Sequence, residues 1–236
     1  MRKLLIVVGA LLVCGAVAFV VFKQVTPART ETPAASTQPT PAATTTTPPA
    51  AGQQTADASE PALYPDDMYL GKADAKVTII EYASLSCPHC AKFNAEVLPR
   101  VKSDYIDKGL VRWVYRDYPL NNPAYLAAVL AHCGSPLRYF GLVDKLFRSQ
   151  DYWAVQPQPI VALKQIGVNE GIDEKTYDAC LADQKLKDKI ISRLQEASTK
   201  YKVEATPSFL IGGKLYSGEL SFDDLKKLID DALGHS

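Results

Sequence analysis

The order of strand-like and helix-like segments after residue 61 is the feature that most constrains the fold of this 236-residue chain. Residues 76–82 (KVTIIEY) and 110–115 (LVRWVY) are short and rich in β-branched and aromatic side chains, which predicts two strands. Between them, residues 90–108 repeat a large apolar side chain every four positions, which predicts a helix that Pro99 kinks. The folded part of the chain is therefore expected to begin with a β-α-β unit.

The middle of the chain carries only helical patterns. Helix-like stretches follow one another over about residues 120–202. They cover residues 124–131, 137–148, 160–166 and 174–201. We therefore expect an all-helical insertion at this point of an otherwise mixed α/β domain.

A hairpin and a helix are predicted at the end of the chain. Residues 208–211 and 214–216 are strand-like and flank a Gly-Gly turn, which is typical of a β-hairpin. Ser221 is expected to cap a last helix over residues 222–233. The complete order of predicted strands and helices indicates one α/β domain over residues 61–236. This segment is long enough to bury a core of its own.

Residues 1–25 are predicted to direct the chain out of the cytoplasm. An unbroken apolar run, residues 4–22, follows Arg2-Lys3, and positive charges mark the cytoplasmic side of a span. As a helix the run would be about 28 Å long, close to the ~30 Å of a bilayer core, so we expect a membrane anchor. Cleavage of the run as a signal peptide, which leaves a soluble domain, and lipidation of Cys14 are the alternatives.

Residues 26–60 are rich in Thr, Pro and Ala and almost lack large apolar side chains. Such a segment cannot bury enough apolar surface to offset its chain entropy, so we expect a disordered linker. Together with the anchor, it predicts a periplasmic, extracytoplasmic domain that is tethered to the inner membrane.

Four cysteines lie in the predicted domain, and an even number in an exported domain predicts two disulfides. Cys133 and Cys180 lie in the helical insertion, and a bond between them would stabilise the fold by roughly 4 kcal/mol on chain entropy. We expect a structural bridge; a second redox-active pair is the alternative.

The tetrad Cys87-Pro88-His89-Cys90 stands where the first strand passes into the first helix. Cys87 is expected at the N-cap and Pro88 at the first helical position, where its missing N–H costs nothing. The free N–H groups and the positive end of the helix stabilise a thiolate at Cys87, and His89 is expected to add to this. Cys90, one turn further on, should be the more buried thiol and resolve mixed disulfides. A low thiolate pKa makes the disulfide form oxidising.

Two other chemistries use the same residues. One is an inert structural disulfide, and the other is a zinc site on Cys87, His89 and Cys90. Zinc needs four ligands, or three and a water, and the two further histidines are His132 and His235, near the C-terminus. We therefore expect no metal and no other cofactor.

The run from Glu81 to Cys90 (EYASLSCPHC) and the downstream segment 205–209 (ATPSF) resemble the DsbA-like thiol:disulfide interchange proteins of the thioredoxin superfamily. The resemblance covers about residues 63–234, and the Cys-Pro-His-Cys tetrad is typical of DsbA proteins. It implies a thioredoxin fold with an inserted all-helical domain, which matches the helical patterns over residues 120–202.

The resemblance also implies roles for three further residues. Pro207 should follow a cis peptide bond and face the active-site disulfide, and Thr206 should pair with an extended substrate through its main chain. Glu81 matches a buried acid that exchanges a proton with Cys90; a strand-end Glu facing water is the alternative. Thr206 departs from the Val of the best-studied enterobacterial DsbA proteins, and this side chain bears on the strength of oxidation.

These features predict an enzyme, a protein thiol:disulfide oxidoreductase that introduces disulfides into exported proteins through Cys87 and Cys90. Its expected partners are reduced or unfolded exported proteins and, by resemblance, a DsbB-like membrane quinone reductase that reoxidises it. A monomer is the default. The 26 Lys+Arg against 26 Asp+Glu leave no basic field for nucleic acid. A disulfide isomerase or reductase of the same superfamily, and a tethered binding module with purely structural cysteines, are the alternatives.

Overall fold

The computed structural model describes residues 53–57 and 62–234, and the fold is given for these residues alone. Their elements are, in chain order, β1 (Gln53–Asp57), β2 (Met68–Leu70), β3 (Val77–Ala83), α1 (Pro88–Glu96), α2 (Leu98–Val101), the π-helix η1 (Lys102–Ile106), β4 (Val111–Asp117), α3 (Asn122–Cys133), the 3-10 helix η2 (Pro136–Arg138), α4 (Tyr139–Arg148), α5 (Gln150–Trp153), α6 (Pro159–Asn169), α7 (Glu174–Ala182), α8 (Gln184–Thr199), β5 (Ser208–Ile211), β6 (Lys214–Ser217) and α9 (Phe222–Leu233). Within these two ranges no helix is long and apolar enough to cross a membrane. The predicted anchor, residues 4–22, lies outside the described residues.

The strands of the described residues form one mixed sheet in the order β1-β6-β5-β3-β4-β2. β3 and β4 run parallel, with Glu81 opposite Tyr115, and the other neighbouring strands are antiparallel. A crossover must join parallel strands, and α1, α2 and η1 provide it. The β5–β6 hairpin turns at Gly212 and Gly213, whose φ angles of 56° and 75° suit residues without a Cβ.

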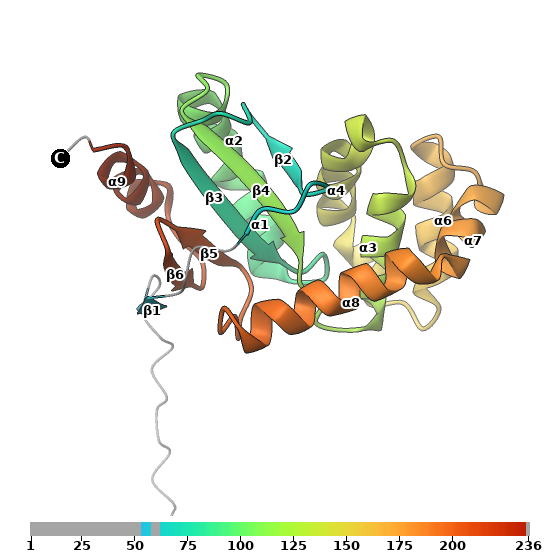
Figure 1. Ribbon diagram of the computed structural model, residues 1–236. Coiled ribbons are helices and arrows are strands. Elements are labelled where there is room, and N and C mark those ends of the chain that lie inside the picture. Colours follow the sequence, from blue (N-terminus) through green and yellow to red (C-terminus); the bar gives the residue numbers. More distant parts are fainter. Residues whose placement is uncertain (1–52, 58–61, 235–236) are drawn as a thin grey trace, which may run out of the picture. The chain divides into compact units, whose positions relative to one another are not determined.

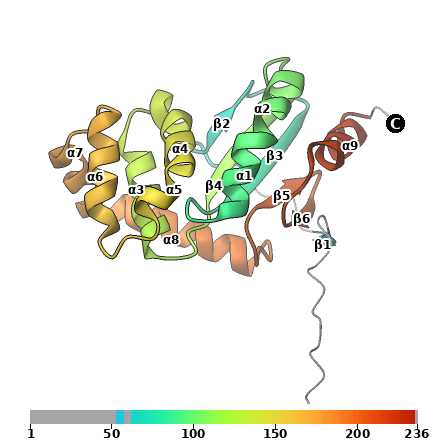
Figure 2. The same ribbon diagram turned by 180° about the vertical axis from the view of Figure 1, so that it is seen from behind.

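Helices cover both faces of the sheet, as the two opposite views show (Figures 1 and 2). On one face, α1 and α9 pack over a cluster in which Phe93, Trp113 and Phe209 lie 4.7–6.0 Å apart between ring centroids. On the other face, the C-terminal part of α8 packs against Ile80 and Leu210. Helices therefore cover both faces of the sheet at β3, the strand that leads to the cysteines.

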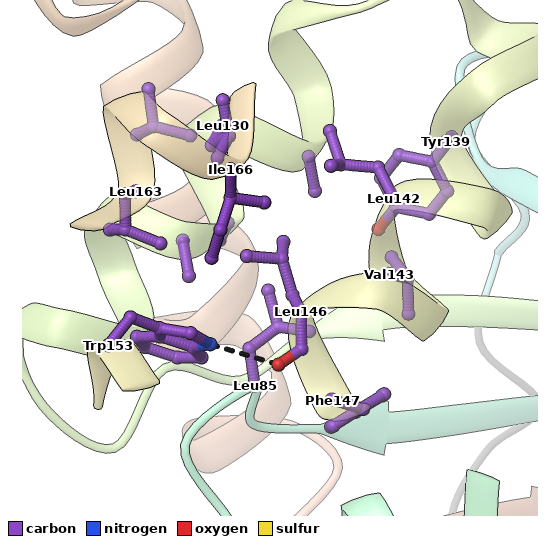
Figure 3. Close-up of a cluster of buried hydrophobic side chains, with 14 of the residues drawn as sticks. Leu85, Leu130, Tyr139, Leu142, Val143, Leu146, Phe147, Trp153, Leu163 and Ile166 are labelled. Carbon is purple, nitrogen blue, oxygen red and sulfur yellow. Dashed lines mark hydrogen bonds between the residues drawn. The ribbon is translucent and has the colours of Figure 1, made fainter. Parts of the chain in front are cut away.

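Helices α3 to α8 lie between β4 and β5 and confirm the predicted helical insertion. Figure 3 shows its core, where the Trp153 indole donates a hydrogen bond of 2.9 Å to the carbonyl of Leu146. Leu85, from the loop before α1, points into this cluster. Cys87 and Cys90 belong to the same buried cluster, so the core of the insertion extends to the dithiol.

Two predicted helices are divided in the structure. The helix predicted over 90–108 becomes α1, α2 and η1, with the break at Val97. Pro99 causes the break, because it cannot donate to the carbonyl four residues earlier and its ring clashes there. The helix predicted over 174–201 is divided at Asp183, whose side chain caps α8 by accepting from two main-chain N–H groups.

Strand β1 corrects the predicted linker boundary. The sequence predicts disorder through residue 60, but Gln53–Asp57 form a strand that pairs with β6. The pairing uses main-chain groups that an edge strand such as β6 leaves open, so it requires no apolar side chain. β2 and α5, of three and four residues, are too short to produce a periodic pattern and were not predicted.

Candidate active site

Strand β3 brings the chain to the dithiol. It ends at Ala83, the Cys87 N–H closes a turn on the carbonyl of Ser84 at 3.0 Å, and α1 begins at Pro88. Cys87 is the N-cap residue, with extended backbone (φ −84°, ψ 121°), and Pro88 occupies the first turn of the helix. The sequence predicted both positions.

The two thiols are free, and they differ in burial and in pKa. Cys87 is 6% exposed and Cys90 is fully buried, as predicted. A hydrogen bond from the Cys90 thiol, with smaller contributions from Thr206 and from the main chain of Cys90 and His89, lowers the pKa of Cys87 to about 5, although burial opposes it. Burial, followed by the interaction with Cys87, raises the pKa of Cys90 far above its ordinary value. At neutral pH the outer sulfur is therefore a thiolate and the inner one a thiol.

The Thr206–Pro207 peptide bond is cis, as the resemblance implies. In its protonated form, the Cys87 sulfur donates a hydrogen bond of 3.3 Å to the Thr206 carbonyl, and this contact joins two segments 119 positions apart. The Thr206 hydroxyl is buried and has no hydrogen-bond partner in the described part of the chain, and its side chain lowers the pKa of Cys87. A thiolate at Cys87 is the acceptor that this hydroxyl lacks.

Glu81 lies buried on β3, and its 2% exposure rules out the alternative of a carboxylate facing water. Its Oε2 accepts a hydrogen bond of 3.0 Å from the Trp113 indole. Burial raises the pKa of Glu81 to about 8; the Trp113 hydrogen bond opposes this rise, and the charge of Cys87 adds to it. The Glu81 charge also raises the pKa of Cys90, so the carboxyl and the inner thiol interact. A carboxyl that titrates near neutral pH can exchange a proton with that thiol.

His89 contributes to the site through its main chain, while its ring is engaged elsewhere. The main chain of His89 is among the groups that lower the pKa of Cys87. The exposed ring lies with Nδ1 at 3.1 Å from Glu219 Oε2, and the other oxygen of Glu219 lies 2.6 Å from Lys92 Nζ. No pattern in the sequence indicated Glu219, because it stands 130 positions after the histidine.

Gln150 is a second residue of the site that the sequence did not indicate. Its side-chain amide donates to the carbonyls of Leu85 and Cys87, at 2.5 and 3.0 Å. It stands at the start of α5, so it ties the helical insertion directly to the loop that carries the dithiol.

Cys133 and Cys180 form a disulfide, with Cα atoms 5.7 Å apart, and the predicted pairing is confirmed. The bond joins the end of α3 to α7, both in the helical insertion. Its role as a brace remains a prediction.

The chemistry that these residues can perform is thiol–disulfide exchange. Such an exchange uses a sulfur of low pKa at a helix N-cap, a more deeply buried thiol one turn away, and a carboxyl whose pKa lies between those of the two sulfurs. In residues 53–57 and 62–234, no three His, Cys, Asp or Glu side chains are grouped closely enough to hold a metal ion.

Comparisons with known proteins agree with this geometry. The family model described as Thioredoxin matches residues 64–231. The putative protein-disulfide oxidoreductase of Rickettsia bellii is 31% identical over 172 residues, which are 72% of this chain and 66% of that protein. The disulfide bond formation protein D of Bacillus subtilis is 26% identical over 178 residues, 70% of this chain and 76% of that protein. Across three rickettsial relatives the match spans 60–66% of their length.

Among solved structures, Wolbachia pipientis alpha-DsbA1 superimposes with a TM-score of 0.69 at 30% identity, covering 73% of this chain and 93% of that one. A mixed sheet with an N-cap Cys-x-x-Cys pair beside a cis proline defines a thioredoxin-fold dithiol protein. The chain belongs to the thioredoxin family and, within it, to the DsbA-like proteins that carry a helical insertion.

Proposed function

We propose that this protein is a thiol:disulfide oxidoreductase that introduces disulfides into exported proteins through Cys87 and Cys90. The observation that carries the proposal is the pKa of Cys87, lowered to about 5. A thiolate held about two pKa units below pH 7 stabilises the reduced protein by about 3 kcal/mol relative to an ordinary thiol. For a two-electron couple this corresponds to about 60 mV in the oxidising direction.

The reaction begins with the oxidised protein, in which Cys87 and Cys90 are joined. A substrate thiolate attacks the Cys87 sulfur, a bond forms between these two sulfurs, and Cys90 leaves with the electron pair of the broken disulfide. Because the pKa of Cys90 is strongly raised, the leaving sulfur takes a proton, and Glu81 is the nearby acid that can supply it.

The second half of the reaction releases the product. A second thiolate of the substrate attacks the substrate sulfur of the mixed disulfide, and the new disulfide forms in the substrate. Cys87 leaves as the thiolate, and its low pKa makes it a good leaving group. The substrate has lost two electrons and the dithiol has gained them.

The proposal extends to the surroundings of the enzyme. Reduced or unfolded exported proteins are its substrates, and reoxidation falls to a DsbB-like membrane quinone reductase. The apolar run over residues 4–22 supports an extracytoplasmic location with a membrane anchor, and a monomer is the default.

The test is the oxidation of a reduced model peptide that contains two thiols, with Cys87→Ser as the control. Rapid stoichiometric oxidation by the wild type and none by the variant supports the proposal, and equal inertness of the two contradicts it. Isomerase or reductase activity is the alternative, motivated by Thr206. Faster recovery of scrambled ribonuclease than oxidation of reduced ribonuclease would favour that alternative.

A further inference from the structure

The side chain of Trp113 joins helix α1 and the sheet to the buried carboxyl of Glu81. Trp113 stands on β4 and is fully buried. Phe93 of α1 stacks on its ring, with 5.7 Å between the ring centroids and 17° between the ring planes. Phe209 of β5 packs against the same ring at a centroid distance of 6.0 Å. Because two elements hold the ring, the direction in which the indole N–H points is fixed.

The indole N–H of Trp113 meets one oxygen of Glu81. Its Nε1 donates to Glu81 Oε2 at 3.0 Å, and both side chains are buried. Tyr115, the residue opposite Glu81 on β4, also has a buried hydroxyl, but that hydroxyl makes no hydrogen bond within the described ranges. Trp113 is therefore the neighbour that holds the carboxyl.

The chemistry of an indole determines what this hydrogen bond does to the proton of Glu81. An indole N–H can donate and cannot accept. In a protonated carboxyl the carbonyl oxygen is the better acceptor, so Oε2 keeps the indole bond and Oε1 carries the proton. A hydrogen bond to a charged acceptor is roughly twice as strong as one to a neutral acceptor, so the contact favours the carboxylate. Accordingly, it opposes the rise that burial causes in the pKa of Glu81.

We propose that Trp113 is a positioning residue for the proton transfer: its indole N–H holds Oε2 of Glu81, so that Oε1 is the oxygen that exchanges a proton with the Cys90 thiol. This inference rests on the proposed function, since it assigns the donor atom in that reaction. When Cys90 leaves the disulfide with the electron pair of the broken bond, the proton passes from Oε1 to its sulfur. The indole bond to Oε2 strengthens as the carboxyl becomes charged.

The first test needs no variant of Trp113. In the reduced full-length protein, the indole 1H–15N resonance of Trp113 should titrate together with the carboxyl 13C resonance of Glu81, near pH 8. Glu81→Gln should abolish the titration of the indole. Trp153, whose N–H donates to the main-chain carbonyl of Leu146, is the internal control and should not change over this range. A Trp113 indole that does not follow Glu81 overturns the inference.

The second test removes the donor with Trp113→Phe. We expect the pKa of Glu81 to rise by about one unit, a factor of about 10 in the ionisation constant. Trp153→Phe is the matched control, because it removes an equally buried indole with a hydrogen bond of its own, and it should leave the pKa of Glu81 unchanged. Equal shifts in both variants, or a pKa that stays or falls in Trp113→Phe, overturn the inference.

The third test follows the reaction itself, through the pH dependence of peptide oxidation. The pH above which Glu81→Gln no longer slows the reaction marks the loss of the Glu81 proton. This pH should lie higher in the Trp113→Phe background, and an unchanged value overturns the role of Trp113 in the transfer. If the wild type fails to oxidise the peptide while the indole follows Glu81, the proposed function fails and the placement of the carboxyl by Trp113 stands.

Discussion

The Cys87 sulfur has a low pKa first because a neighbouring thiol donates to it, and only then because it stands at a helix end. The Cys90 hydrogen bond is the largest cause of the lowering, and the main-chain N–H groups of the first turn contribute less. From the sequence, the helix end was expected to be the main cause. The two cysteines therefore act as one unit, in which the buried proton of Cys90 stabilises the charge on Cys87.

Replacement of Cys90 by Ala should raise the pKa of Cys87. A hydrogen bond to a charged group contributes about 1.5–3 kcal/mol, which corresponds to a rise of about 1–2 pKa units. The pH dependence of thiolate absorbance, or of the alkylation rate by iodoacetamide, measures this change. Cys90→Ser keeps a donor and should show a smaller rise. Equal pKa values in the wild type and in Cys90→Ala would assign the lowering to Thr206 and the helix end instead.

Glu81 should make the stability of the reduced protein fall as pH rises. Its pKa is about 8 in the folded protein and about 4.3 in an unfolded chain, so between these values the unfolded chain has released a proton that the folded protein keeps. Stability is lost across this window and is constant above it. Glu81→Gln removes this loss, and at pH 7 we expect it to be more stable by at most about 4 kcal/mol.

Urea denaturation of both reduced proteins from pH 4 to pH 9 measures the difference. The Cys87 thiolate contributes the opposite slope, a stability that grows from about pH 5 upward. Both proteins share it, so the difference between them reports Glu81 together with its interaction with the Cys87 charge. Glu81→Gln should also oxidise peptide more slowly, because Cys90 then lacks its proton donor. Parallel stability profiles for the two proteins would contradict a raised Glu81 pKa.

At the scale of elements, local signals predicted most of the fold, and contacts across the chain decided the rest. The last helix was predicted with its observed bounds, residues 222–233, and with Ser221 as its cap. Capping and periodicity are local properties of the sequence. The cause of the division at Asp183 is also local, because the Asp183 side chain caps α8. It was not predicted, since the helical pattern continues on both sides of this single aspartate. Gln150 and Glu219 could not be predicted, since Gln150 reaches the Cys87 carbonyl from 63 positions away and Glu219 reaches His89 from 130 positions away.

Gln150 links α5 to the loop before α1, and Gln150→Glu should weaken that link. The carboxylate has the size of the amide but cannot donate to the carbonyls of Leu85 and Cys87. Two buried acceptors lose their donor and a charge is added beside them, so we expect a loss of about 2 kcal/mol or more in stability and a higher pKa of Cys87.

Gln165→Glu is the matched control, because Gln165 is an exposed glutamine whose amide bonds Asn169 within α6. Its effect on stability should stay within about 0.5 kcal/mol. If urea denaturation finds the two variants equally stable, Gln150 does not hold the loop that carries the dithiol.

At the scale of the whole molecule, the helical insertion and the sheet share the core in which the cysteines lie. Cys87 and Cys90 pack in the same cluster as Leu146 and Trp153 of the insertion. The sequence predicted the insertion and its place between the two parts of the sheet, because an uninterrupted series of helical patterns is a strong signal. It could not predict that the insertion supplies the surroundings of the dithiol, since that depends on packing between segments far apart in the chain.

The Cys133–Cys180 disulfide should stabilise the insertion without taking part in the redox reaction. It closes a loop with a sequence separation of 47 residues, and the chain-entropy model gives roughly 4 kcal/mol for such a loop. The double variant Cys133→Ala/Cys180→Ala should therefore melt roughly 8–16 °C lower. Its Cys87–Cys90 couple should keep the glutathione equilibrium of the wild type at temperatures where both proteins are folded. A variant that melts like the wild type would contradict the bracing role. A variant whose Cys87–Cys90 couple changes its glutathione equilibrium while the fold is intact would identify Cys133 and Cys180 as a pair that tunes the active site.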